Sequence, residues 1–206
     1  MNRIIAIDGP TASGKGTLAK KIAKHFNLPY LNTGGLYRSI GLFLFKNNID
    51  DYSKETVVSL LNRVDFSDLD NEELYVENIG AIASKIAAIP EVRQYLFDMQ
   101  RKFALQPSGA VLDGRDIGTV ICPEASFKFY VTASVEERAN RRFKEMVSKG
   151  KDVSYETILN KLVERDKSDR SRKNAPLQKA DDAIEIDTTN MSKEEAFEFV
   201  IGKIQL

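Results

Sequence analysis

The sequence predicts an α/β fold, in which a parallel sheet of five strands carries helices on both faces. Its candidate strands are nearly continuous apolar runs rather than alternating ones, as expected for strands that are buried on both sides. Segments with helical periodicity lie between these runs, and an alternation of strands and helices is typical of a parallel sheet. Ligands of such sheets bind at the carboxyl ends of the strands, so the residues that follow each strand are the first candidates for a site.

The loop after the first strand has the spacing Gly-x-x-x-x-Gly-Lys-Gly-Thr. Glycines let successive backbone N–H groups turn toward an anion, and the dipole of the following helix adds to the attraction. Lys15 would bring a positive charge to the outer phosphates, and Thr17 a hydroxyl group close to Mg²⁺. We therefore predict that a nucleoside triphosphate binds to this loop, which consists of Gly9, Pro10, Thr11, Ala12, Ser13, Gly14, Lys15, Gly16 and Thr17.

Composition limits the remaining possibilities. A chain of 206 residues is long enough for one α/β domain with small insertions. Its formal net charge of zero argues against a large nonspecific surface for nucleic acid. The single cysteine, Cys122, excludes internal disulfides and zinc sites built from several cysteines, and the single histidine, His25, makes multi-histidine metal sites improbable. No apolar run approaches the ~18 residues that span a bilayer, and no leader precedes the first strand. We expect a cytoplasmic protein that binds neither nucleic acid nor a membrane.

The first half of the chain is predicted to contain two strands of the sheet and a long insertion. A helix is expected at 14–26, where apolar residues recur with helical spacing, and a short strand at 29–31. Residues 32–35 are expected to form a loop. The span 32–107 is too helical for a strand–helix repeat, so it is interpreted as an insertion. Its expected elements are helices at 36–46 and 53–63, a two-stranded element at 65–66 and 74–76, and helices at 78–87 and 90–106.

The second half returns to the sheet, with strands expected at 110–112, 127–131 and 183–186. Two Ser-x-x-Glu sequences, beginning at Ser134 and Ser192, have the spacing of capping boxes and each should start a helix. Helices from 134 and over 155–172 carry many arginines and flank a short connection that contains Gly150. We interpret this region as a lid over transferring phosphates, although a solvated helix face with pairs such as Arg165–Asp169 is the alternative. The predicted division is a core of 1–31, 108–143 and 173–206, an insertion at 32–107 and a lid at about 144–172.

Charged residues also follow the strand at 110–112. Asp113 stands where a carboxylate can reach Mg²⁺ through its water shell, or it is simply a turn residue. Arg115 and Asp116 either pair with each other, or Arg115 binds an anion while Asp116 accepts hydrogen bonds from an amino group. No general base stands out, and none is needed if the acceptor is a phosphate oxygen. The residues thus indicate a phosphoryl transferase or a nucleoside triphosphatase with two anion sites, and they leave the acceptor open.

Several segments together resemble bacterial cytidylate kinases, which belong to the P-loop nucleoside monophosphate kinases. The resemblance covers nearly the whole chain, and Asp-Gly-Arg-Asp-Ile-Gly-Thr at 113–119 is more specific than the loop at 9–17. The other matching segments are 5–17, 30–38, 164–172 with Ala175-Pro-Leu177, and 187–189. Two departures are visible: Asn32 stands where the family has an aspartate, and the stretch between Phe66 and Ser84 is shorter than in typical members.

The resemblance implies the nucleoside monophosphate kinase fold and transfer of the γ-phosphate of ATP to CMP or dCMP, with Mg²⁺ as cofactor and a monomeric enzyme. The residues implied to bind CMP are Thr33, Tyr37, Arg38, Ser84, Arg93, Arg115, Asp116, Asp169 and Arg172. Those implied to act in catalysis are Lys15, Asp113, Arg115, Arg165 and Arg172. Thr17 and Asp113 are implied to hold Mg²⁺, mainly through water.

Two rival functions remain at this point. One is a kinase of the same core that acts on another nucleoside monophosphate or small molecule. The other is a nucleotide-dependent ATPase that binds RNA through the arginine-rich helix; the zero net charge counts against it.

Overall fold

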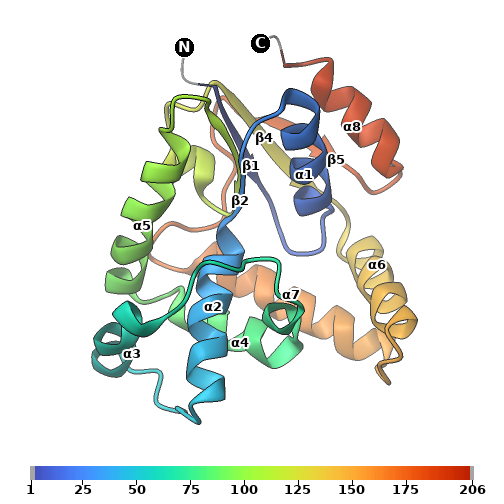
Figure 1. Ribbon diagram of the computed structural model, residues 1–206. Coiled ribbons are helices and arrows are strands. Elements are labelled where there is room, and N and C mark those ends of the chain that lie inside the picture. Colours follow the sequence, from blue (N-terminus) through green and yellow to red (C-terminus); the bar gives the residue numbers. More distant parts are fainter. Residues whose placement is uncertain (1–2, 205–206) are drawn as a thin grey trace. The chain divides into compact units, whose positions relative to one another are not determined.

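The computed structural model describes residues 3–204, and Figure 1 shows the course of the chain. The chain divides into two compact units, of which one comprises the chain up to Tyr30 and from Ala104 onward, and the other Leu31–Phe103. Each unit is described by itself below. Within residues 3–204, no helix is both long enough and apolar enough to cross a membrane.

The first unit is built on the predicted five-stranded sheet, with the strand order β2-β3-β1-β4-β5. Strand β1 pairs in parallel with β3 and β4, and β4 pairs in parallel with β5. Asp8 lies opposite Gly114 and opposite Tyr130, so the carboxyl ends of three central strands lie at one edge. The strands are β1 (Ile4–Asp8), β2 (Tyr30–Asn32), β3 (Ala110–Gly114), β4 (Phe127–Thr132) and β5 (Ile184–Asp187).

Apolar burial accounts for the strands at the centre of the sheet. Every residue of β1 and β3 is buried, so both faces of the sheet are covered at its centre, as the continuous apolar runs predict. Helices α1 (Lys15–Phe26) and α8 (Lys193–Ile201) pack their apolar residues, among them Ile22 and Val200, into the same core as Phe129 of β4. The α/β fold class predicted from the sequence is confirmed.

The predicted pair of arginine-rich helices is also present. They are α6 (Val135–Ser148) and α7 (Tyr155–Ser171), which pack through a small apolar cluster that includes Ala139, Ile158 and Leu162. The capping box at Ser192 is complete, since its hydroxyl accepts from the backbone N–H of Glu195 and the Glu195 carboxylate accepts in return. Only half of the box forms at Ser134: its hydroxyl caps α6, but the carboxylate three residues later is used by Arg141.

The second unit is helical, as expected. Its elements are α2 (Thr33–Lys46), α3 (Lys54–Leu60), the short 3-10 helices η1 (Leu61–Arg63) and η2 (Glu72–Tyr75), α4 (Glu77–Ile86) and most of α5 (Pro90–Ala104). Helices α2 and α4 approach closely at Gly41, where a side-chain Cβ would lie 3.2 Å from the backbone oxygen of Ile79.

Two local predictions were wrong, and one element was missed. Residues 33–35 are not a loop but the first turn of α2, because the Asn32 side chain accepts a hydrogen bond from Gly35 N and so begins the helix early. The two-stranded element at 65–66 and 74–76 does not form; Asn71 caps the 3-10 helix η2 in its place. Finally, the segment after β3 contains a π-helix, η3 (Ile117–Ile121), which the sequence pattern did not reveal.

Candidate active site

The loop between β1 and α1 has the backbone geometry of an anion site. Gly9 has a φ of 148°, and a Cβ there would lie 2.0 Å from the backbone oxygen of Val131, so only glycine fits. Gly14, with a φ of 87°, precedes α1 and offers no side-chain cap. The first turn of α1 contains no acidic residue either. The positive end of this helix is therefore left for a ligand to neutralise.

Lys15 lies buried within this loop. Its Nζ donates to the backbone oxygen of Pro10 at 3.1 Å. Burial, together with the positive charges of Arg115 and Arg165, lowers the pKa of Lys15 to about 7, and the negative charge of Asp113 limits the shift. The fully buried hydroxyl of Ser13, in the same loop, has no hydrogen-bond partner within residues 3–204. A bound polyanion would relieve both conditions, because it favours the charged form of Lys15 and offers acceptors.

Asp113, at the end of β3, faces the same loop. The Tyr30 hydroxyl donates to its Oδ1 at 2.8 Å, and its Oδ2 lies 3.5 Å from the position that a Cβ on Gly16 would take. Burial raises the pKa of this carboxyl, and Lys15 counteracts the shift. Tyr30 was not singled out from the sequence, since its hydroxyl meets Asp113 only through the sheet.

The residues predicted to hold Mg²⁺ suit that ion. Thr17 is exposed in the first turn of α1, and Asp113 lies beside the neighbouring Gly16. A hydroxyl and a carboxylate are oxygen donors, which Mg²⁺ prefers, and this ion usually keeps several waters and takes phosphate oxygens as further ligands. Within residues 3–204, no group of three or more His, Cys, Asp or Glu side chains could hold a metal by itself. A site completed by a nucleotide therefore fits this chain better than an all-protein cage.

The end of β3 meets the end of α7 through two ion pairs. Arg115 Nε donates to Asp169 Oδ2 at 2.8 Å, and Arg172 Nη2 lies 3.8 Å from Asp116 Oδ1. Arg172 Nε also donates to the backbone oxygen of Ala175 at 2.6 Å. The structure thus brings together four of the predicted site residues. Arg115 and Asp116 do not pair with each other, because each has a partner more than 50 residues away.

Arg165 completes this positive cluster from α7. Its Nε is buried and has no hydrogen-bond partner within the described part of the chain. Burial lowers the pKa of Arg165 to about 10, and the neighbouring charge of Arg115 adds to the effect. A guanidinium held in this way is a candidate ligand for an anion.

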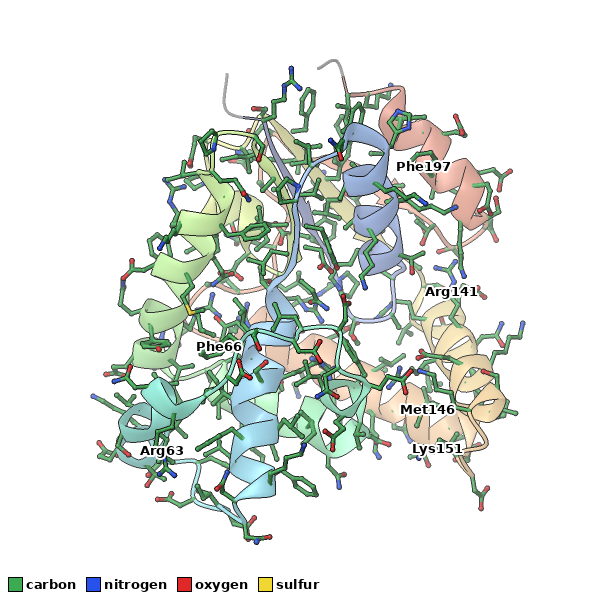
Figure 2. All side chains as sticks on the ribbon, in the orientation of Figure 1. Arg63, Phe66, Arg141, Met146, Lys151 and Phe197 are labelled. Atoms are coloured by element: carbon green, nitrogen blue, oxygen red, sulfur yellow. The ribbon has the colours of Figure 1, made fainter. Side chains whose placement is uncertain are left out.

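Two arginines of α6, Arg138 and Arg141, are held by contacts within the protein. Arg138 is buried and donates to both carboxylate oxygens of Asp166, at 3.1 and 2.6 Å, and to the backbone oxygen of Thr11 at 3.3 Å. Arg141 donates to Glu137 and to the Thr188 backbone, and Figure 2 shows it near the start of α6. These two side chains tie α6 to α7, to the loop and to the end of β5.

The remaining predicted CMP ligands belong to the second unit. Thr33 is buried at the start of α2, and Ser84 is partly buried on α4. The Arg93 guanidinium lies 5.9 Å from the ring centroid of Tyr37, which brings these two residues together. Arg38 donates to the backbone oxygen of Leu74 at 2.8 Å.

Asn32 makes one contact that an aspartate could not make, because only its amide can donate a hydrogen bond. Its Oδ1 caps α2, while its amide donates to the hydroxyl of Tyr75 at 2.9 Å, and that hydroxyl donates to the backbone oxygen of Leu69 at 2.9 Å. The Tyr75 ring lies 5.5 Å from the guanidinium of Arg38. The departure at residue 32 is thus linked to the short η2 segment.

Asp8 is a further residue that the sequence interpretation missed. It ends β1, is 5% exposed, and accepts hydrogen bonds from Ile117 N and Gly118 N, each at 2.8 Å. Burial raises its pKa to about 7, the two N–H groups oppose this, and Asp116 adds to it. A charged residue at the end of an otherwise apolar strand was the signal that could have drawn attention to it.

A parallel sheet with a glycine-rich loop after β1, a buried lysine in that loop, and arginines after β3 and on α7 define a P-loop nucleotide-binding protein of the phosphotransferase type. A family model described as cytidylate kinase matches residues 5–206. The chain belongs to the cytidylate kinase family, as its sequence motifs predicted.

Individual relatives agree with this assignment. A cytidylate kinase from Methylocella silvestris is 50% identical over 94% of this chain and 90% of its own length. One from Xanthobacter autotrophicus is 47% identical over 98% of this chain and 97% of its own length. Among solved structures, an uncharacterized protein from Eubacterium ventriosum matches with a TM-score of 0.56 at 18% identity, over 99% of this chain and 98% of that protein. The last comparison indicates a shared fold alone.

Proposed function

We propose that the protein transfers the γ-phosphoryl group of ATP to CMP or dCMP, giving ADP and CDP or dCDP. The observation that carries this proposal is the convergence of three cations: Arg115 and Arg165 lie close enough to Lys15 to lower the pKa of its amine. Lys15 belongs to the loop, Arg115 follows β3, and Arg165 lies on α7. Such a cluster suits a transition state in which negative charge is spread over a transferring phosphoryl group.

The loop residues 9–17 would bind ATP through backbone N–H groups, and Lys15 would contact its outer phosphates. Arg115, Arg165 and Arg172 would stabilise the charge that develops during transfer, with Arg115 and Arg172 also contacting the acceptor phosphate. The chain needs no general base, because an acceptor phosphate oxygen is already deprotonated at neutral pH. Catalysis would thus consist of positioning and electrostatic stabilisation.

Thr17 and Asp113 would hold Mg²⁺ beside the triphosphate, largely through water. When bound, the ion supplies positive charge that helps to neutralise the phosphates. The hydrogen bond from Tyr30 would fix the direction of the Asp113 carboxylate. Its contribution is orientation rather than direct contact.

Recognition of the acceptor would depend on the residues that the family resemblance implies. Asp116 would accept a hydrogen bond from the cytosine amino group, a donor that uracil lacks. Asp169 would contact the ribose. The second unit would contribute the remaining contacts to CMP, from Thr33, Tyr37, Arg38, Ser84 and Arg93.

A panel of acceptors tests the proposal. Purified protein with Mg-ATP should release ADP much faster with CMP or dCMP than with UMP, AMP or no acceptor. A faster release of ADP with another monophosphate than with CMP would identify that compound as the preferred acceptor. Strong ATPase activity that ignores every acceptor, together with salt-dependent binding of RNA, would favour the RNA-binding alternative. A cytoplasmic location and a monomeric state stay predictions from the sequence.

A further inference from the structure

The Asp8 carboxylate connects two segments that the proposed reaction uses for different substrates. It directly precedes Gly9, the first residue of the phosphate-binding loop. Its Oδ1 accepts from Ile117 N and its Oδ2 from Gly118 N, both at 2.8 Å. Both oxygens therefore accept hydrogen bonds from the segment after β3. Arg115 and Asp116 directly precede the two donor residues in the sequence.

The segment held in this way has an unusual backbone. The π-helix η3 forms through bonds five residues apart, from Ile121 N to the oxygen of Asp116 and from Cys122 N to the oxygen of Ile117. Helices of this kind are rare, and they are found mostly as single turns near functional sites. The first N–H groups of any helix lack partners within it, and Asp8 supplies acceptors for two of them. Asp116, the residue just before η3, takes its backbone direction from this turn.

Gly118 lies close to both Asp8 and Lys128. A Cβ on Gly118 would lie 3.2 Å from Cδ of Lys128 and 3.5 Å from Oδ2 of Asp8. Asp8 is also buried beside charges of both signs, since Asp116 raises its pKa and Lys15 lowers it. Burying a carboxylate is costly, and an apolar residue would complete the apolar strand β1 at lower cost. The carboxylate is therefore better explained by its hydrogen bonds than by stability alone.

We propose that Asp8 is a positioning residue for acceptor selection, which fixes the backbone that carries Arg115 and Asp116 through its two hydrogen bonds to the start of η3. This inference rests on the proposed function, because it assumes that Asp116 recognises the acceptor base. Asp8 itself contacts neither substrate, and its effect passes through the η3 backbone. Loss of the carboxylate should consequently weaken the choice between acceptors more than it weakens the use of ATP.

The central experiment replaces Asp8 with asparagine. In Asp8→Asn, one oxygen becomes an amide that cannot accept, so at least one N–H of η3 loses its partner. Steady-state kinetics should show that the ratio of kcat/KM for CMP to kcat/KM for UMP falls by about 10-fold, as expected for one lost bond to a charged group. The KM for Mg-ATP should change by less than about 3-fold. Asp116→Ala provides the benchmark, since it removes the proposed base contact directly.

A matched control uses another aspartate that caps a turn. Asp51 accepts from Ser53 N and from the hydroxyls of Ser53 and Thr56, but it is exposed and belongs to the second unit. Asp51→Asn should leave the CMP-to-UMP ratio of kcat/KM and the KM for Mg-ATP within about 2-fold of wild type, because substitutions at exposed sites usually have small effects. It corrects for any general effect of replacing a capping carboxylate.

A second variant covers the case in which Asp8→Asn fails to fold. Gly118→Val keeps the carboxylate but adds a branched side chain where a Cβ alone would already lie 3.2 Å from Cδ of Lys128 and 3.5 Å from Oδ2 of Asp8, so it should displace the same contact from the other side. It should lower the CMP-to-UMP ratio in the same direction with the KM for Mg-ATP retained. An unchanged ratio in whichever variants fold, or a loss confined to ATP, would overturn the inference.

The proposed function and this inference fail in different ways. If wild-type protein prefers a monophosphate other than CMP, the proposed function is wrong, and Asp8→Asn is then judged by the ratio of that acceptor to its nearest analogue. If wild type prefers CMP but the variants select acceptors as wild type does, only the role of Asp8 is wrong.

Discussion

Replacing Lys15 with methionine should stabilise the nucleotide-free protein while removing its activity. The pKa of Lys15 is lowered from 10.5 to about 7, chiefly by burial. Such a shift corresponds to about 5 kcal/mol, at about 1.4 kcal/mol for each tenfold change in proton affinity. The lost hydrogen bond to Pro10 O offsets about 1 kcal/mol of this gain. Methionine has a similar length and carries no charge into the buried site.

The effect has a defined dependence on pH. Between pH 7 and 10.5 the unfolded chain binds a proton at Lys15 that the folded chain has released, so wild-type stability rises with pH across this window. Below about pH 7 Lys15 is charged in the folded chain as well as in the unfolded one, so the full free-energy cost of the buried charge lowers the stability of the wild type. The advantage of Lys15→Met should therefore be largest at pH 7 or below and should shrink as the pH approaches 10.5.

Thermal unfolding provides the assay. For a chain of this size, 1 kcal/mol shifts the Tm by about 2–4 °C, so nucleotide-free Lys15→Met should unfold about 8–16 °C above wild type at pH 7. Mg-ATP should raise the Tm of wild type but hardly that of the variant. Lys21→Met is the control, because Lys21 lies partly exposed on the same helix, where it pairs with the exposed Glu194 at 2.6 Å and lies over the ring of Phe197. A Tm for Lys15→Met at or below that of wild type at pH 7 would refute the reasoning.

Two further predictions follow from contacts of the first unit. Tyr30→Phe removes the donor to Asp113 Oδ1, so the Mg²⁺ concentration for half-maximal rate should rise by about 10-fold, and an unchanged Mg²⁺ titration would contradict this role. Arg138→Met removes the partner of the largely buried Asp166 and should lower the free energy of unfolding by about 3 kcal/mol in urea titrations. Arg142→Met breaks a more exposed pair with Glu145, so it should lower the free energy of unfolding by less than about 1 kcal/mol. Adding Asp166→Asn to Arg138→Met should recover part of the loss; equal losses from both arginine substitutions would count against the buried pair.

The local patterns of the sequence predicted most of the sheet and of the loop. An apolar strand followed by Gly-x-x-x-x-Gly-Lys predicts a strand, a turn with positive φ and a helix, because glycine adopts the positive φ of Gly9 and Gly14 without strain. The helices of the second unit were also predictable from periodicity. The two-stranded element was not, since Asp65 and Tyr75 lie in a stretch whose short apolar runs fit a strand or a 3-10 turn equally well.

The partners of the arginines could not be predicted in the same way. The many arginines of 134–172 indicated cations near phosphates, but their number did not distinguish one arginine from another. The buried Nε of Arg165 has no hydrogen-bond partner in the described chain. Arg138, in contrast, donates to Asp166 and to backbone oxygens. That distinction depends on which face of α6 meets α7 and the loop. Residue type and spacing along one helix do not determine contacts between helices.

Asp8 shows where a stricter reading of the sequence would have gone further. The apolar run that begins at Ile4 ends at Asp8, the run that begins at Ala110 ends at Asp113, and parallel pairing aligns Ile4 with Ala110. With that register Asp8 lies opposite Gly114, so its side chain stands next to the segment that leaves β3. Two strands and their register were enough to place this carboxylate beside Arg115 and Asp116. The π-helix that it caps was beyond sequence patterns, because a single extra residue in a turn leaves no periodic signal.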